Sequence, residues 1–233
     1  MKGSLLKLLW FGTVLSVCAS SLLTTGCGSS GTRIRYVNAI PNQGGLDFVV
    51  DSTTVLTNAT YGSAAQAKYQ GGSSGSHTIE VRNTGTATDL INSSVTVQGG
   101  ADTTYIAEKV SGNNTAVVFT DDNRAPSSGN VKIRVINASP TCPVDVYIVP
   151  HGTSIGSFSP TWPNIVQPKA SPNYLAPSAG TYDIIGTFPG TQFPIAEILN
   201  QTFAAGQVRT VVFLDSPQGG QPCSASLILA DVN

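Results

Sequence analysis

The sequence predicts an all-β protein with two tandem immunoglobulin-like antiparallel β-sandwich domains. Three observations support this prediction: short apolar runs rich in Val, Ile, Thr and Tyr, breaks at Gly, Pro, Asn and Ser about every ten residues, and an internal repeat of about 100 residues. Seven or eight short strands in about 100 residues are typical of an immunoglobulin-like sandwich, with a small closed barrel as the alternative. After the N-terminal segment, no stretch keeps a sustained helical period.

The first 26 residues are predicted to be an export signal. Lys2 and Lys7 form a basic start, and a mostly apolar run of 16 residues covers 8–23. As a helix this run would span about 24 Å, which is short of the ~30 Å hydrocarbon core of a bilayer. A cleaved signal is therefore favoured over a permanent membrane span.

The end of this segment, Leu23-Thr24-Thr25-Gly26-Cys27, resembles the lipobox of bacterial lipoproteins, although its leucine stands one place earlier than usual. The resemblance implies that the Cys27 thiol takes a diacylglycerol, that the chain is cut before Cys27 and that the new amine is acylated. Residues 1–26 are then a lipoprotein signal peptide, and 27–32 are a lipidated linker. Several acyl chains together hold a protein firmly on a membrane.

The internal repeat is clearest where each copy opens. The stretch 33–41, RIRYVNAIP, returns as KIRVINASP at 132–140, and LDFVV at 46–50 is echoed by VDVYI at 144–148. A period of about 100 residues suits a whole domain better than a solenoid unit. The chain is therefore expected to contain two copies of one domain.

The repeat sets the expected domain boundaries. We expect a first β-sandwich domain over 33–123, a linker rich in Pro, Gly and Ser over 124–130, and a second β-sandwich domain over 131–233. The clearest strand candidates are 34–40, 47–50, 103–110 and 208–214.

Alternation defines the two faces of the second copy's first strand. Val131, Ile133 and Val135 are apolar, whereas Lys132 and Arg134 stand between them. Successive side chains of a strand point to opposite faces, so the apolar and charged residues are expected on different sides of the sheet.

Composition excludes several classes of function. Only 11% of the residues are charged, against about 25% in a typical soluble protein. Without 1–26 the chain keeps 10 of its 12 basic residues against 13 acidic ones, a net charge of −3. This leaves no basic face for nucleic acid, and no motif calls for a nucleotide, a metal or another cofactor.

The cysteines fit an oxidising compartment. Cys18 lies in the predicted signal and Cys27 is the predicted lipid site, which leaves Cys142 and Cys223 as a pair. A disulfide is the default expectation for such a pair in an exported protein, since two thiols without a nearby His make a poor metal site. Closing a loop of about 80 residues would stabilise the fold by about 4 kcal/mol in the chain-entropy model.

Four stretches also resemble a known family. They are an R-x-x-N-A-x-P motif at 134–140, a V-D-V-Y strand at 144–147, a P-x-x-G-T-Y-D-I stretch at 177–184, and the T-D-D-N run at 120–123. Together they resemble a family catalogued only as a domain of unknown function, DUF 4397, in two copies over nearly all of 33–233. The resemblance implies an exported, β-rich protein and brings no catalytic or ligand residues. The first copy departs from the pattern, because a Gly/Ser-rich stretch stands where the second has its Pro177–Gly180 turn.

Residues that both copies keep are expected to serve the shared fold. The predicted roles are a cross-strand Arg–Asp pair and an Asn that bonds to the backbone of a turn. The matched residues are Arg35 with Arg134, Asp47 with Asp145, and Asn38 with Asn137.

A segment that only the second copy carries is the best place to seek binding. It lies between Pro150 and Pro177 and is rich in aromatic residues and proline. Exposed aromatic side chains on a stiff loop can stack on sugar rings or anchor a protein partner. The alternative is that they fold back over a sheet edge. The candidate ligand-binding residues are Trp162, Phe158, Tyr174 and His151.

Two further patterns are better explained without chemistry. Residues 71–75, GGSSG, match a G-x-S-x-G nucleophile elbow, but no helix follows and His77 is close in sequence, so a flexible loop is expected. Asp121-Asp122-Asn123 could suggest calcium, but the matching run at 231–233 has lost one acid. Neither histidine, His77 or His151, has a second ligand at zinc spacing.

These features favour a non-enzymatic binding or structural lipoprotein of the cell envelope, which presents two β-sandwich domains to a surface glycan or a protein partner. The membrane attachment would be the lipid on Cys27, and Gly28 after it suits the outer membrane if the host has two membranes. The alternatives are an exported hydrolase that acts on polysaccharide, which needs two carboxylates about 5–10 Å apart, or an accessory carbohydrate-binding protein.

Overall fold

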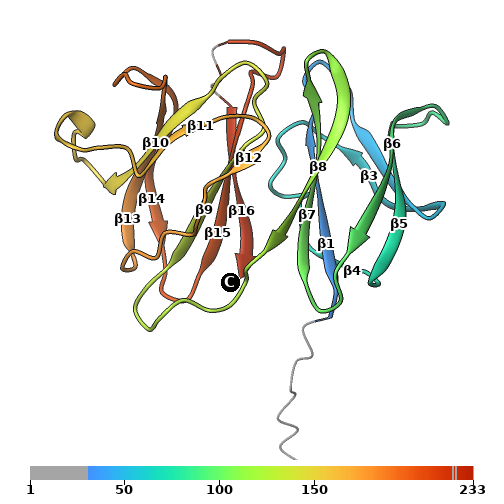
Figure 1. The fold of residues 1–233 in the computed structure, drawn as a ribbon, viewed down its shortest axis with the longest axis horizontal. Helices are drawn as coiled ribbons and strands as arrows, with labels where there is room; N and C mark the ends of the chain where they lie inside the picture. The colour runs from blue at the N-terminus through green and yellow to red at the C-terminus, as the bar shows by residue number, and fades with distance from the viewer. Residues whose placement is uncertain (1–30, 222, 224, 233) are drawn as a thin grey trace, which may run out of the picture.

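The computed structural model describes residues 31–221, 223 and 225–232. The predicted signal peptide and its Cys27 lipidation site lie outside this range. Two halves stand side by side, a first half over 31–123 and a second half over 131–232, and each holds two four-stranded sheets (Figure 1). The predicted β-sandwich class is confirmed.

The first half is built from one inner and one outer sheet. The inner sheet has the order β4-β1-β7-β8 and the outer sheet the order β3-β2-β5-β6. Its strands are β1 (Arg33–Ala39), β2 (Leu46–Val50), β3 (Thr53–Ala59), β4 (Gln70–Gly71), β5 (Gly75–Asn83), β6 (Asp89–Val97), β7 (Asp102–Val110) and β8 (Asn113–Asp121).

The second half has the same strand order. Its inner sheet runs β12-β9-β15-β16 and its outer sheet β11-β10-β13-β14. Its elements are β9 (Lys132–Asn137), β10 (Val144–Pro150), the short 3-10 helix η1 (Ile155–Ser157), β11 (Trp162–Ile165), β12 (Lys169–Ala170), β13 (Gly180–Thr187), β14 (Pro194–Phe203), β15 (Val208–Leu214) and β16 (Ala225–Val232).

Each inner sheet contains one parallel pair, which departs from the expected antiparallel pattern. β1 runs parallel to β7, with Arg35 opposite Thr104. β9 runs parallel to β15, with Arg134 opposite Thr210. Between the two parallel strands the chain builds all four strands of the outer sheet and one short edge strand of the inner sheet, and it then returns to the inner sheet in the same direction.

The turn from β7 to β8 shows how local sequence fixes a hairpin. Val110 pairs with Asn113, so Ser111 and Gly112 form a two-residue connection. Both have positive φ, 48° and 84°, as a type I′ hairpin turn requires. Gly112 meets this requirement without strain because it has no Cβ.

Each half has its own apolar core between its two sheets. In the second half Val131, Ile133 and Val135 of the first strand and its entry lie in this core, as their alternation predicted. In the first half, Tyr36, Phe48 and Tyr105 meet as tilted and edge-on rings with centroids 5.3–6.1 Å apart.

A third core lies where the two inner sheets face each other, and we call this contact the seam (Figure 1). It contains alternate residues of the inner strands, whose neighbours fill the separate cores. The buried apolar residues of the seam are Val37, Ala39, Ala67, Ile106, Ile136, Ala138, Val212, Leu214 and Leu229. Both faces of each inner sheet are therefore covered.

Within the described residues, no helix has the length and apolar character needed to cross a membrane.

Candidate functional site

Two buried arginines cross the seam. The guanidinium of Arg35 in the first half forms an ion pair with Asp231 of the second half, and both side chains are fully buried. Its Nε also donates to Thr104 Oγ1 at 2.7 Å, and its Nη2 donates to Thr210 Oγ1 at 3.2 Å. The hydroxyl of Thr210 in turn donates to Asp231 at 2.6 Å.

The second half contributes a matching arginine with a similar set of partners. Arg134 pairs with Asp121 of the first half and donates through Nε to Thr210 Oγ1 at 2.9 Å. Thr104 donates to Asp121 at 2.6 Å, just as Thr210 does to Asp231. Each half therefore supplies one arginine and one aspartate, and each arginine pairs with the aspartate of the other half. Arg35 also lies 3.6 Å from Asp121 of its own half.

Burial and charge act against each other in this network. Burial raises the pKa of Asp231, and the neighbouring Arg35 offsets part of that rise. Burial acts to lower the pKa of Arg134, but the nearby Asp121, Tyr174 and Asp231 together outweigh it, so the pKa of Arg134 is raised. Removing one member would leave a buried charge without compensation, which is far more costly than losing an exposed pair.

The expected Arg–Asp partners were therefore wrong. Arg35 does not pair with Asp47, because Asp47 lies on the outer sheet while Arg35 points into the seam. Asp47 instead accepts the backbone N–H of Asn58 at 2.8 Å. Asp145 likewise accepts the N–H groups of Asn164 at 2.6 Å and Gly190 at 2.8 Å. Both aspartates hold the turns of the outer sheets.

The side chains of the matched asparagines form hydrogen bonds with backbone groups, as expected. The Asn38 amide donates to the Ala59 carbonyl at 2.8 Å and its oxygen accepts the Ile40 N–H at 3.0 Å. Asn137 donates to the carbonyls of Cys142 at 2.7 Å and Ile165 at 2.8 Å. Each fixes the chain where it leaves the inner sheet.

Two tyrosines cover the charged network from opposite sides. The Tyr69 ring lies 4.6 Å from the Arg35 guanidinium, and the Tyr174 ring lies 5.3 Å from that of Arg134. The Tyr174 hydroxyl also accepts the N–H of Asp122 at 3.1 Å. Tyr174, a predicted ligand-binding residue, is partly buried and packs at the seam on Arg134.

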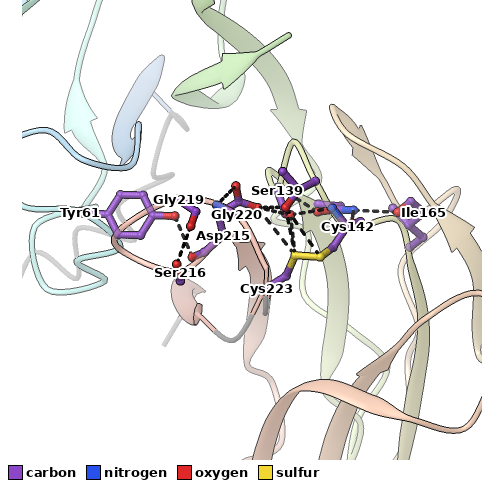
Figure 2. The surroundings of a disulfide bond; sticks show 11 residues. Tyr61, Ser139, Cys142, Ile165, Asp215, Ser216, Gly219, Gly220 and Cys223 are labelled. Atoms are coloured by element: carbon purple, nitrogen blue, oxygen red, sulfur yellow. Dashed lines mark hydrogen bonds between the residues drawn. A yellow bond between two sulfur atoms is a disulfide. The ribbon is translucent and has the colours of Figure 1, made fainter. Parts of the chain in front are cut away.

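The predicted disulfide, Cys142–Cys223, is formed, with the two Cα atoms 6.1 Å apart. It anchors the loop after β15, which reaches across the seam (Figure 2). The Tyr61 hydroxyl donates to the Asp215 carbonyl at 2.9 Å, and the Asn42 N–H donates to the Pro217 carbonyl at 3.0 Å. The disulfide thus secures a contact between the halves.

The buried Asp215 carboxylate organises the base of this loop. It accepts the Ser139 hydroxyl at 2.5 Å, the Thr141 hydroxyl at 2.9 Å and the Gly220 N–H at 3.0 Å. Gly220 has a φ of 76°, a conformation that favours glycine. Asp215 therefore links the loop to both halves. Its carboxylate accepts hydrogen bonds within the second half, and its backbone carbonyl accepts the Tyr61 hydroxyl of the first half.

Cavities open at both ends of the seam. At the end where β1 begins, a cavity of about 520 Å³ is lined by residues that include Arg33, Asp102, Asp122 and Arg124. At the opposite end, a cavity of about 340 Å³ lies between Lys109 and the Asp215 loop. The charged groups at the first cavity are engaged with each other: Arg33 bonds to Asp102 at 2.7 Å, and Arg124 bonds to Asp122 at 2.8 Å.

The Asp121-Asp122-Asn123 run is occupied by protein contacts. Asp121 pairs with Arg134, while Asp122 pairs with Arg124 and with Lys132, whose Nζ is 2.8 Å away. The hydrogen bond from Arg124 lowers the pKa of Asp122. Among the described residues, no group of three His, Cys, Asp or Glu side chains is placed to hold a metal ion.

The aromatic segment of the second half divides into buried and exposed parts. Trp162 is only 4% exposed, lies in the core of the second half and donates through Nε1 to Asn173 at 2.8 Å. The expectation that Trp162 binds a ligand was therefore wrong, and the alternative that it folds back was correct. Phe158 and His151 are both exposed, and His151 is hydrogen-bonded to Asp183 at 2.8 Å.

The GGSSG stretch forms a hydrogen-bonded chain that its sequence spacing did not predict. His77 Nδ1 is 2.7 Å from Asp51, and Nε2 is 3.4 Å from the Ser73 hydroxyl and 3.1 Å from the Ser73 carbonyl. The bond to Asp51 raises the pKa of His77, and the carbonyl adds to this. His77 thus joins the loop to the β2–β3 turn through contacts of both its ring nitrogens.

One notable residue was missed entirely. Glu108 of β7 is fully buried at the seam, where Gln167 of the second half donates to its Oε2 at 3.2 Å. Its Oε1 has no hydrogen-bond partner within the described structure. Burial raises the pKa of Glu108 to about 7. The matching position of β15 is Leu214, so a comparison of the two copies could have singled it out.

The fold and the seam define an all-β protein of paired sandwiches whose strand order is the same in both halves. Comparison with known proteins adds one family. Residues 32–147 match the model of the family described as "Domain of unknown function (DUF4397)". This match spans the first half and continues through β9 into β10.

Comparisons with curated proteins and with solved structures identify no further family. No curated protein matches the chain. Among solved structures, "The Bacillus anthracis TIE protein" aligns over 79% of this chain and 33% of its own, with 11% sequence identity and a TM-score of 0.24. The chain thus spans about a third of that protein's length.

Proposed function

We propose that this protein is a non-enzymatic lipoprotein of the cell envelope, in which two tandem copies of one β-sandwich domain act as a single rigid unit that presents its outer surfaces to a surface glycan or a protein partner. The domains extend over 33–123 and 131–233, joined by the linker 124–130. The lipid on Cys27 anchors the unit, on the outer membrane in a host with two membranes.

The seam is the observation that carries this proposal. Reciprocal pairs, Arg35 with Asp231 and Arg134 with Asp121, lie inside a shared apolar core. The mirrored contacts support an origin by duplication, because each half uses matched residues to hold the other. A rigid unit loses little conformational freedom when it binds, which suits a protein that presents a surface.

The hydrophobic N-terminal segment and its Cys27 support the anchor, as argued from the sequence. At the cavity of about 520 Å³, Arg33 and Arg124 are hydrogen-bonded to Asp102 and Asp122, which supports a structural role for these charged residues. Both ring nitrogens of His77 contact Asp51 or Ser73, which supports a role for the GGSSG stretch in joining this loop to the β2–β3 turn rather than in nucleophilic catalysis.

The anchor is tested by expressing the full chain in a bacterial host fed an alkyne analogue of palmitate. The wild type is expected to take the label and to sediment with membranes, and its mass is expected to show cleavage before Cys27. Cys27→Ala is expected to lose the label. An unlabelled wild-type chain that keeps Met1 would overturn the proposal.

A further inference from the structure

Two aromatic side chains stand out on the outer surface of the second half. Phe193 is 73% exposed and Phe158 is 45% exposed. Every other Phe, Tyr or Trp side chain in the described part of the chain is at least partly buried. Burying a phenylalanine is strongly favourable, so two exposed ones on neighbouring loops indicate a contact surface.

The loops that carry them are joined and ordered. The Gln192 amide, next to Phe193, donates to the Gly156 carbonyl of η1 at 3.3 Å. The N–H of Phe158 donates to the Ile155 carbonyl at 2.9 Å, so Phe158 directly follows a closed turn. The two rings are therefore presented by one connected surface.

Packing under this surface holds it in place. Ile155 of η1 packs on the buried residues Tyr147, Val149 and Ile185, which form a small cluster on the outer sheet. On the other loop, the N–H of Phe193 donates to Thr191 Oγ1 at 3.3 Å. The first half has no counterpart of the segment that carries Phe158, so the surface belongs to the second half.

The two stretches of the chain that carry the rings contain polar but no charged residues. The stretches 152–168 and 184–196 contain no Asp, Glu, Lys, Arg or His. The residues near the two phenylalanines in the sequence include hydroxyl and amide side chains, namely Ser154, Ser157, Ser159, Thr191 and Gln192. The ring faces carry partial negative charge and attract the C–H groups of an apolar face, while hydroxyls and amides exchange hydrogen bonds with alcohols.

We infer that Phe158 and Phe193 form a binding platform for a neutral polysaccharide, whose sugar rings stack on the phenylalanines while its hydroxyls meet the surrounding Ser, Thr and Gln side chains. A ligand with phosphate, sulfate or carboxylate groups would find no cation in these two stretches. A neutral glycan matches both the apolar rings and the uncharged rim. This inference rests on the proposed function and names the partner of its outer surface.

Affinity electrophoresis of the full chain in detergent, in gels that contain soluble neutral or anionic polysaccharides, tests the inference. The wild type is expected to be retarded by at least one neutral polysaccharide. Phe158→Ala and Phe193→Ala are each expected to weaken binding about tenfold, as central aromatic contacts do, and the double variant to abolish it. Leu199→Ala, at an apolar position of β14 that is 54% exposed, is the matched control and should bind like the wild type.

Unchanged melting temperatures of the variants are expected because both rings are exposed. Retention of binding in the double variant, equal loss in Leu199→Ala, or retardation by anionic polysaccharides alone would overturn the platform. The same holds if no polysaccharide retards the wild type. Labelling at Cys27 is a separate measurement, so failure of the platform and failure of the lipid anchor are told apart.

Discussion

At the scale of single residues, chemistry is decided by where a side chain is buried. Arg35 and Arg134 are charged residues of alternating strands, a pattern that usually marks a solvated face, yet the two guanidinium groups are enclosed at the seam. Glu108 is enclosed nearby, and within the described structure its hydrogen-bond donor is the neutral amide of Gln167 rather than a cation. Its carboxyl is therefore stable in the folded protein chiefly in its neutral form.

This burial makes the free energy of unfolding depend on pH. The pKa of Glu108 is raised to about 7 in the folded protein, against an ordinary value near 4.5 in the unfolded chain. Between these values the folded state binds more protons, so the unfolding free energy falls as pH rises from about 4.5 to about 7 and then levels off. The full fall is on the order of 3 kcal/mol.

Urea unfolding at pH 5 and pH 8 measures this effect. Glu108→Gln is expected to reduce the loss of stability between the two pH values, because a neutral amide has no proton to release. Glu197→Gln, a change at an exposed carboxyl, serves as the control. Equal pH dependence of wild type and Glu108→Gln would show that Glu108 is not held neutral.

At the scale of elements, the loop after β15 forms a contact between the two halves outside their sheets. The segment after β15 is tied back by the Cys142–Cys223 disulfide and touches the first half through Tyr61 and Asn42. Sequence reasoning identified the bond from cysteine arithmetic. It could not predict that the disulfide holds a loop against the first half, because Tyr61 and Asn42 are more than 150 residues from that loop in the chain.

Replacing both cysteines by serine is expected to destabilise the protein by about 4 kcal/mol, since the closed loop of about 80 residues is released. The N–H of Asn42 should also exchange faster with solvent, because its acceptor, the Pro217 carbonyl, is no longer held. Hydrogen-exchange mass spectrometry of the peptide around Asn42 measures the second effect.

Tyr61→Phe is the control for this loop, since it removes one hydrogen bond to the Asp215 carbonyl and leaves the disulfide intact. It should cost about 1 kcal/mol and leave the Asn42 exchange nearly unchanged. If exchange at Asn42 is the same in the double-serine variant as in wild type, the disulfide does not hold the loop across the seam.

At the scale of the whole molecule, the two halves share a core and exchange buried charges. A surface that would face solvent in an isolated sandwich is covered by the other half over the length of both inner sheets. Neither half can leave without exposing apolar residues and a buried arginine. We therefore expect the halves to unfold together.

Urea unfolding followed by Trp162 fluorescence, which reports on the second half, and by far-ultraviolet circular dichroism, which reports on both, should give coincident transitions. Arg35→Ala and Arg134→Ala should each cost about 3–5 kcal/mol. Arg134→Ala should cost the less of the two, because Asp121 still has Arg35 at 3.6 Å, whereas Arg35→Ala removes the arginine paired with Asp231. Arg82→Ala breaks part-exposed pairs with Asp89 and Glu80 in the outer sheet and should cost under about 1 kcal/mol. Two separated transitions in wild type would show that the halves are independent.

The sequence by itself determined the β class, the repeat, the cysteine pair and the alternation of the inner strands, because these follow from short-range periodicity and from composition. Only the tertiary structure decided that the charged face of those strands is buried, that Arg35 reaches Asp231 rather than Asp47, and that Trp162 is core while Phe158 is surface. The physical reason is that strand periodicity assigns a residue to one of two faces but does not say what covers each face. Here the inner sheet of the other half, which has the same strand order, covers the charged face, and contacts between residues nearly 200 positions apart leave no mark in local sequence.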